Sequence, residues 1–174
     1  SSATPSGAGG AGGMAASGGA DANGGADAVG GMGGMEPQDP VGWFWQNPTP
    51  QGNWLRSTQF FDGTTGWAVG NSGTILKTTN GGATWTAQAS GTTEHLLEVH
   101  VVDASTSWAV GQSGTIIKTT DGGAVWTAQA SGTVNTFSGV HFVDASTGWA
   151  VGQSGTIIKT TDGGGIWIAQ PAPS

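Results

Sequence analysis

The sequence contains no cysteine and no tyrosine, and only four of its 174 residues are basic. The absence of cysteine excludes disulfide bonds and metal sites that use thiolate ligands. The four cations, Arg56, Lys77, Lys118 and Lys159, are scattered along a chain whose net charge is −7. Proteins that bind nucleic acid neutralise phosphates with clustered Lys and Arg. We therefore expect no nucleic-acid partner and no binding to an anionic membrane surface.

Long apolar runs are also missing, so the sequence predicts no transmembrane segment. Residues 1–40 contain no aromatic residue, and 13 of the residues before Met35 are glycine. Such a stretch cannot bury enough apolar surface to form an ordinary core. All nine tryptophans occur from Trp43 onward, which places the core there. We expect three parts: a Gly/Ala-rich arm over 1–40, an aromatic lead-in strand over 41–54, and three repeats over 55–95, 96–136 and 137–174.

The arm has a period of three. Its Gly-Gly pairs begin at residues 9, 12, 18, 24, 30 and 33. This period matches an extended polyproline II-type helix, which has three residues per turn and packs closely through glycine faces. The alternative is a flexible glycine-rich tether.

The repeat of 41 residues is the strongest signal in the sequence. Trp67, Trp108 and Trp149 recur at this spacing within the runs GWAVGNSGTILKTT, SWAVGQSGTIIKTT and GWAVGQSGTIIKTT. Each copy has four short apolar segments separated by Gly, Asp and Ser turns, which predicts an antiparallel meander. A four-stranded unit of about 40–45 residues is typical of a β-propeller blade. We therefore expect an all-β fold of three four-stranded antiparallel propeller-type blades.

The turn between the third and fourth segments carries a motif in every copy: TTNGGATW, TTDGGAVW and TTDGGGIW. An Asp in such a turn accepts backbone N–H bonds, and glycine adopts the positive φ that the turn needs. We assign the motif a structural role, with Trp packing against the sheet and Asn80 keeping the acceptor without the charge. Its residues are Asn80, Gly82, Trp85, Asp121, Gly123, Trp126, Asp162, Gly164 and Trp167.

These runs resemble the Asp-box, or BNR, motif. Residues 43–170 as a whole resemble the photosystem II assembly/stability-factor-like propeller repeats, and WFWQNPTPQGNWL resembles their opening strand and linker. The resemblance implies a β-propeller. It carries no single function, because one fold serves many roles.

Candidate active sites are weak, and we predict no catalytic residue, no cofactor and no metal. Sialidases also carry Asp-boxes, but their chemistry implies several arginines and a tyrosine, which this sequence lacks. A glycosidase needs paired carboxylates. Glu94 and Glu98 flank His95, but the next repeat has Asn135 and Gly139 at the corresponding positions.

Two further patterns have an ordinary and a functional interpretation. His100 and His141 are equivalent positions, and Glu98 shares a strand face with His100, which leaves open a metal site against ordinary strand residues. Lys77, Lys118 and Lys159 form a row, which is interpreted either as an anion-binding stripe or as solvated charge that discourages edge pairing.

Propellers usually have four to eight blades, so three blades leave two apolar end faces without a neighbour. Exposed apolar faces of a few hundred Å² usually mark an interface. We therefore expect the chain to associate with itself, as a closed six-bladed ring of two subunits or as a filament. The aromatic residues Trp43, Phe44, Trp45 and Trp54 form the candidate interface, as an intersubunit plug or core rather than a sugar platform.

The leading hypothesis is a non-enzymatic structural protein that self-associates as a filament or surface-assembly subunit. A small-residue arm before a β domain is common after a signal cleavage site, so we expect an extracellular or cell-surface location. One alternative is a surface-tethered module that binds a protein or a glycan. Another is an assembly factor like the photosystem II relatives.

Overall fold

The computed structural model describes residues 52–171, which belong to one compact unit spanning residues 43–174. Within this part the fold is all-β, as expected, with no α-helix. The predicted arm over 1–40 and the residues Trp43, Phe44 and Trp45 lie outside the described residues, so the proposed division of the first 54 residues stays a prediction. No helix of the described part is long and apolar enough to cross a membrane.

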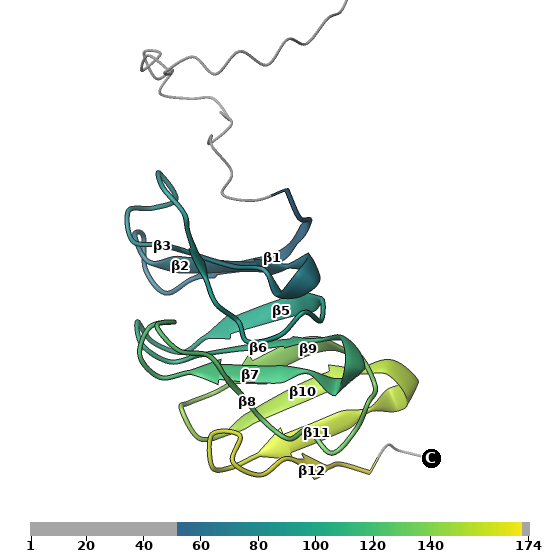
Figure 1. The fold of residues 1–174 in the computed structure, drawn as a ribbon. Helices are drawn as coiled ribbons and strands as arrows, with labels where there is room; N and C mark the ends of the chain where they lie inside the picture. Colours follow the sequence, from purple (N-terminus) through teal and green to yellow (C-terminus); the bar gives the residue numbers. More distant parts are fainter. Residues whose placement is uncertain (1–51, 172–174) are drawn as a thin grey trace, which may run out of the picture. The chain divides into compact units, whose positions relative to one another are not determined.

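Three antiparallel sheets of four strands follow one another along the chain (Figure 1). Blade 1 consists of β1 (Leu55–Phe60), β2 (Gly66–Gly70), β3 (Ile75–Thr78) and β4 (Thr86–Gln88). Blade 2 consists of β5 (Leu96–Val101), β6 (Ser107–Gly111), β7 (Ile116–Thr119) and β8 (Thr127–Ala128). Blade 3 consists of β9 (Phe137–Phe142), β10 (Gly148–Gly152), β11 (Ile157–Thr160) and β12 (Ile168–Ala169). Each sheet has its strands in chain order, which confirms the predicted meander.

A short 3₁₀ turn joins the second and third strand of every blade: η1 (Asn71–Gly73), η2 (Gln112–Gly114) and η3 (Gln153–Gly155). Its central serine has a positive φ in each copy, for example 56° at Ser113. In the first two blades there is no space for a Cβ atom on the glycine that follows this serine. A Cβ on Gly114 would lie only 1.9 Å from the carbonyl oxygen of Thr133 in the linker to blade 3.

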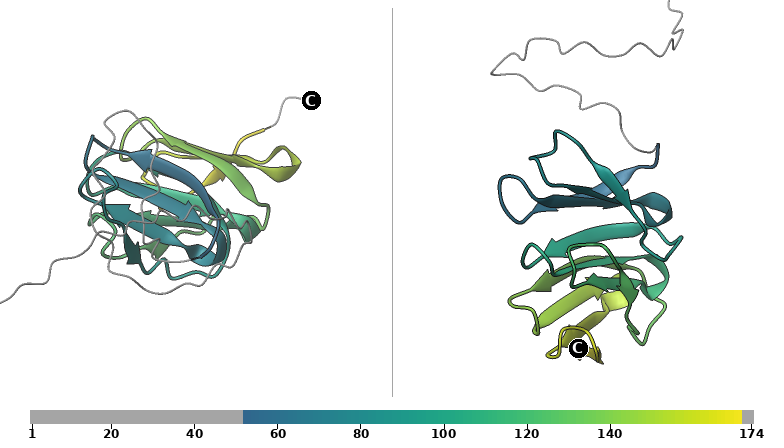
Figure 2. Two further views of the ribbon diagram at one scale, coloured as in Figure 1. Left: turned by 90° about the horizontal axis from the view of Figure 1, so that it is seen from above. Right: turned by 60° about the vertical axis from the view of Figure 1, so that its left-hand side comes forward.

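The blades stack with their first strands side by side, so β5 lies next to β1 and β9 lies next to β5. Figures 1 and 2 show blade 2 between its two neighbours. We call the side of a blade that faces the preceding blade its leading face, and the opposite side its trailing face. Because strand side chains alternate between the two sides of a sheet, each blade has one apolar set for each face.

Two hydrophobic clusters fill the gaps between the blades. The first joins the trailing face of blade 1, with Trp67, Val69 and Ile75, to the leading face of blade 2. The second joins the trailing face of blade 2, with Trp108, Val110 and Ile116, to the leading face of blade 3. A blade is too thin to have a core of its own, so its stability depends on its neighbours.

Candidate functional site

The Asp-box turn is held by a buried threonine and the acceptor that follows it. In blade 2, Thr119 Oγ1 donates to Asp121 Oδ1 at 2.8 Å and accepts from the Gly123 amide at 2.8 Å. Asp121 Oδ1 also accepts from the Val125 amide at 3.0 Å. These hydrogen bonds lower the pKa of the Asp121 carboxyl group, the Val125 amide contributing most.

The other two copies keep this geometry. Asp162 Oδ1 accepts from the Ile166 amide at 3.0 Å, and Asn80 Oδ1 accepts from the Thr84 amide at 2.9 Å. The amide oxygen of asparagine therefore supplies the acceptor in blade 1, as the sequence suggests. The structural role of the nine motif residues stays a proposal, and substitution of Gly123 tests it.

Lysine joins the Asp-box turns of blades 2 and 3 to the preceding blade. Lys77 Nζ in blade 1 donates to the carbonyl oxygen of Gly122 at 2.7 Å, and Lys118 Nζ in blade 2 donates to that of Gly163 at 3.0 Å. Each ammonium group also lies over the indole ring of its own blade's tryptophan, at 4.9 Å for Trp67. Lys77 and Lys118 form neither an anion-binding stripe nor a row of solvated charges, because both ammonium groups donate to a carbonyl oxygen of the next blade.

Glutamine makes a second contact at the same turn. Gln88 accepts from the indole N–H of Trp126 at 3.3 Å, and its amide nitrogen lies 3.4 Å from the carbonyl oxygen of Gly122. In the next pair of blades, Gln129 repeats both contacts with Trp167 and Gly163, at 3.3 and 3.1 Å. The motif tryptophan thus binds the preceding blade as well as packing on its own sheet.

The role of these glutamines is not predictable from their residue type. The signal was present, because Gln88, Gln129 and Gln170 recur at the 41-residue spacing, three positions after each motif tryptophan. Spacing alone gives no indication that a side chain reaches across to another blade.

The third contact lies on the first strands. Gln59 Oε1 accepts from the Val101 amide at 3.0 Å, and His100 Nε2 lies 3.0 Å from the carbonyl oxygen of Phe142. Gln59 and His100 occupy equivalent positions and reach equivalent residues of the next blade. Burial is the largest cause that lowers the pKa of His100, followed by the charge of His141, whose ring centroid lies 4.7 Å away.

The histidine pair does not form a metal centre with Glu98 in the structure. Among residues 52–171, no group of three His, Asp or Glu side chains could hold a metal ion. Burial raises the pKa of Glu98. Glu94, the other carboxylate weighed for catalysis, instead accepts from the Ser113 hydroxyl at 3.0 Å.

The trailing face of blade 3 presents the same groups without these contacts. Val151 is 43% exposed, whereas its equivalents Val69 and Val110 are fully buried. Trp149 is half-buried with Lys159 Nζ 5.1 Å from its ring centroid. Within residues 52–171, neither Lys159 nor His141 has a hydrogen bond to another blade.

The leading face of blade 1 is partly exposed as well. Leu55 is 47% and Phe60 is 40% exposed, whereas the equivalent Leu96 and Val101 of blade 2 are buried. Trp54, a candidate interface residue, is 71% exposed and lies beneath the Arg56 guanidinium group at 5.3 Å. The other candidates, Trp43, Phe44 and Trp45, are outside the described residues.

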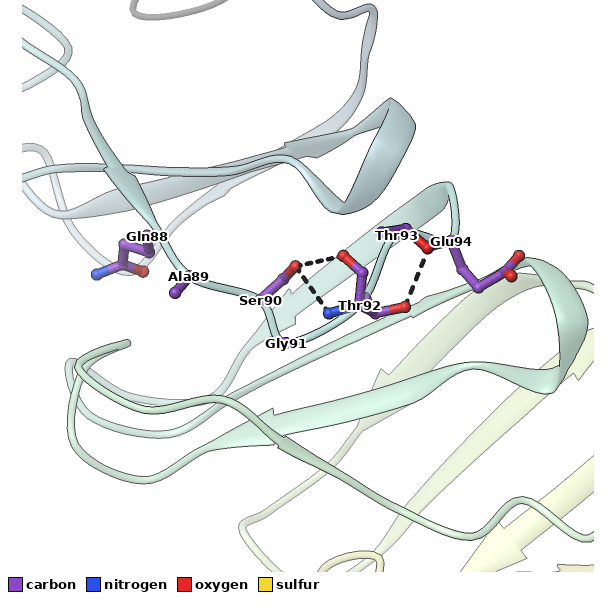
Figure 3. A pocket seen from close by; sticks show the side chains of 7 residues that line it. All are labelled: Gln88, Ala89, Ser90, Gly91, Thr92, Thr93 and Glu94. Atoms are coloured by element: carbon purple, nitrogen blue, oxygen red, sulfur yellow. Dashed lines mark hydrogen bonds between the residues drawn. The ribbon is translucent and has the colours of Figure 1, made fainter.

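A pocket of about 620 Å³ lies along the linker between blades 1 and 2 (Figure 3). Its lining comprises residues 88–94, and its shape rests on internal hydrogen bonds. Ser90 Oγ donates to the carbonyl oxygen of Thr92 at 3.0 Å, and Thr92 Oγ1 accepts from the Glu94 amide at 3.1 Å. The lining combines hydroxyl groups and the Glu94 carboxylate with apolar atoms, so the pocket is mixed in polarity and weakly acidic.

Comparisons with known proteins agree with the repeat architecture. The family model of the photosynthesis system II assembly factor YCF48 matches residues 43–130, about half of the chain. No significant match is found among curated proteins.

Two solved structures carry the same fold. The chain is similar to YCF48 bound to D1 peptide, with 25% sequence identity and a TM-score of 0.63 over 71% of this chain and 43% of that one. It is also similar to YCF48 from Cyanidioschyzon merolae, with 27% identity and a TM-score of 0.61 over 70% of this chain and 38% of that one. This chain therefore spans less than half the length of either relative.

A third structure, a GH74 enzyme from Niastella koreensis, has 22% identity and a TM-score of 0.53 over 63% of this chain and 20% of that one. This similarity shows the fold alone.

One prediction is overturned by these relatives. The expected extracellular or cell-surface location is wrong, because the matching family and two solved relatives are those of a photosystem II assembly factor. The family also favours the assembly-factor hypothesis over the filament hypothesis. Sequence, fold and solved relatives lead to one conclusion: the chain belongs to the photosynthesis system II assembly factor YCF48 family.

Proposed function

We propose that this chain is a non-enzymatic protein-binding module that holds an extended segment of a partner protein during the assembly of a larger complex. The observation that carries the proposal is its membership of an assembly-factor family in which one solved relative is bound to a peptide. The proposal is limited to a peptide-binding role, since the chain spans less than half the length of that relative.

The residues available for chemistry support binding rather than catalysis. In the described part, the Asp carboxylates with lowered pKa, such as Asp103 and Asp144, accept hydrogen bonds inside their own turns. Their shifts come from these turn contacts and so do not indicate an active site. The similarity to a GH74 enzyme adds no catalytic residue, since it shows the fold alone.

The linker pocket is the site that we assign to the peptide. It lies along the linker between two blades, where Thr93 is exposed and Thr92 is half-buried (Figure 3). Glu94 supplies negative charge at one end, and the net charge of the protein is −7. A peptide with a basic residue is therefore favoured by charge complementarity.

Isothermal titration calorimetry with the full chain tests this function. The titrant is the D1 peptide, and the control is a peptide of the same composition in scrambled order. We expect saturable 1:1 binding of the D1 peptide with a Kd in the micromolar range and no saturation with the scrambled peptide. Equal binding of both peptides, or binding of neither, would overturn the proposal.

A pair of variants locates the binding site. Glu94→Gln removes the charge at the pocket and should weaken a peptide that contains a basic residue by about three- to tenfold, which corresponds to about 0.7–1.4 kcal/mol. Glu98→Gln removes a carboxylate from β5 outside the pocket and should leave the affinity unchanged. Equal effects of the two variants would mean that the peptide binds elsewhere.

A further inference from the structure

The trailing face of blade 3 carries a set of side chains that is already used twice within the molecule. In blades 1 and 2, the equivalent side chains bind the next blade through three polar contacts and one apolar cluster. Lysine binds the Asp-box carbonyl, glutamine binds the same carbonyl and the tryptophan indole, and Gln59 or His100 binds the first strand. In blade 3 these positions are Lys159, Gln170 and His141.

In the described part of the chain no blade follows blade 3 to receive this set, and His141 packs only against the ring of His100 in the preceding blade, at 4.7 Å between ring centroids. The Gln170 side chain donates to the carbonyl oxygen of Ile168 in its own strand, at 3.2 Å. Val151 is exposed, and Trp149 and Ile157 are half-buried, whereas the equivalents of all three are buried in blades 1 and 2. An apolar face of this kind, with polar groups at fixed places, is typical of an interface.

The groups that this set would bind are those of a leading face. In blades 2 and 3 they are a Gly carbonyl of the Asp-box turn and the apolar side chains of the first strand. Blade 1 has the same groups on its leading face, with Gly81 equivalent to Gly122 and with Leu55 and Phe60 exposed. The two ends of the described unit therefore complement each other as successive blades do.

We propose that the trailing face of blade 3 binds the leading face of blade 1 in a second copy of this chain. The contact repeats the interface that blades 1 and 2 make with the following blade. Lys159 donates to the Gly81 carbonyl of the second copy, and His141 contacts its β1. Because donor and acceptor faces differ, the association is head to tail, and it ends only when a ring closes.

Sedimentation velocity of the full chain over 1–100 µM tests the association. We expect the weight-average mass to rise above the monomer mass of 17.2 kDa as the concentration increases. Lys159→Met keeps the length of the stem and removes the donor, so it should weaken association about tenfold. A monomer at every concentration would overturn the proposal.

Lys118→Met is the matched control, since it removes the equivalent contact inside the chain. It should lower the thermal midpoint of the dilute monomer, whereas Lys159→Met should leave that midpoint unchanged and change only the association. If both variants lower the midpoint equally, blade 3 is covered by its own chain, and the proposal fails.

A mixing experiment tests the head-to-tail orientation. Val151→Glu blocks the trailing face of blade 3, and Leu55→Glu blocks the leading face of blade 1. Both residues are exposed in the single chain, so neither variant should unfold it. Each variant alone should be monomeric, and an equimolar mixture should form dimers and nothing larger, through the one intact pair of faces. Absence of dimers in the mixture would overturn the proposed pairing.

Discussion

Lys77 in β3 donates a hydrogen bond to the carbonyl oxygen of Gly122, in the Asp-box turn of the next blade, at 2.7 Å. The same ammonium group lies 4.9 Å from the centroid of the Trp67 ring. A group held on one side by an aromatic ring and on the other by a carbonyl oxygen fixes the spacing of the two blades. Lys77 therefore stabilises the stack rather than serving as a free surface charge.

Substitution of Lys77 with methionine should lower the free energy of unfolding by about 1–2 kcal/mol. The variant loses a charge-assisted hydrogen bond and a cation–π contact while the apolar stem stays in place. Urea unfolding monitored by tryptophan fluorescence measures the difference. In dilute solution Lys159→Met should change the free energy by less than about 0.5 kcal/mol, because its amine makes no contact between blades in residues 52–171. Equal losses for both variants would contradict the role given to Lys77.

Gly123→Ala should destabilise the fold more than a glycine substitution in open space, for two reasons. Its φ is +90°, and a Cβ there would lie 2.1 Å from Oε1 of Gln88 in the preceding blade. Gly132→Ala is the control, because φ is +74° there and a Cβ would meet no atom within 4 Å. We expect about 1 kcal/mol for the control, from backbone strain alone, and about 1 kcal/mol more for Gly123→Ala, because the flexible Gln88 side chain must move and lose its hydrogen bond to Trp126.

Gln88→Ala should recover part of the loss caused by Gly123→Ala, since it removes the side chain that clashes. The double-variant cycle therefore predicts a smaller loss than the sum of the two single losses. Additive losses would mean that the strain lies in the backbone only.

Thr119→Val tests the hydrogen bonds inside the Asp-box turn. Valine has nearly the same shape, but it cannot donate to Asp121 or accept from the Gly123 amide, which lies 2.8 Å from Thr119 Oγ1. A buried amide without a partner costs about 1–3 kcal/mol, so stability should fall by about 2 kcal/mol. Thr127→Val in exposed β8 is the control, and denaturant midpoints give the comparison. A loss in the control equal to that of Thr119→Val would contradict this account.

The stability of the stack should rise with pH below about 6.5 because of His100. Burial lowers the pKa of His100 in the folded chain below the ordinary value of 6.5. Between the lowered pKa of the folded chain and the ordinary value of the unfolded chain, the unfolded chain binds more protons than the folded chain, so protonation favours unfolding. This destabilisation disappears above pH 6.5. His100→Gln, which copies Gln59 of blade 1, should flatten this part of the profile of unfolding free energy against pH. An unchanged slope in the variant would assign the effect to another group.

The aspartates of the turns act in a lower pH range. Hydrogen bonds to the side chain and backbone of Ser146, and to the backbone of Thr147, lower the pKa of Asp144 below 3.8. Their contribution to stability is therefore present above the unfolded value and disappears as the pH falls through the folded pKa. The two ranges separate the effect of His100 from that of the aspartates.

The sequence predicts the local structure well, because each element depends on neighbours in the chain. The strand from Ser107 to Gly111 and the turn after Thr119 follow from alternation and from Asp and Gly at fixed places. The same pattern of four apolar segments recurs three times at a spacing of 41 residues, and this recurrence supports the prediction of three similar blades. These features need no knowledge of how one blade lies against another.

The sequence could not show which side chains join the blades. Lys77 and Gln88 reach residues 45 and 34 positions away. The sequence suggested only an anion-binding stripe or solvated charge for Lys77, and no role for Gln88. The candidate metal pair illustrates the same limit, since His100 contacts the carbonyl oxygen of Phe142, 42 residues away. A contact between blades depends on the distance and angle between two sheets, and the hydrophobic pattern of either sheet contains neither quantity.

The amino-acid sequence by itself determined the repeat, the four-stranded unit and the Asp-box turn, because hydrogen bonds and φ preferences act over a few residues. Only the tertiary structure decided that Lys77, Lys118, Gln88 and Gln129 bind the next blade, whereas Lys159 and Gln170 of blade 3 make no hydrogen bond to another blade within the described residues. The physical reason is that identical residues acquire different roles when one copy has a neighbouring blade and the next copy has none within the described chain.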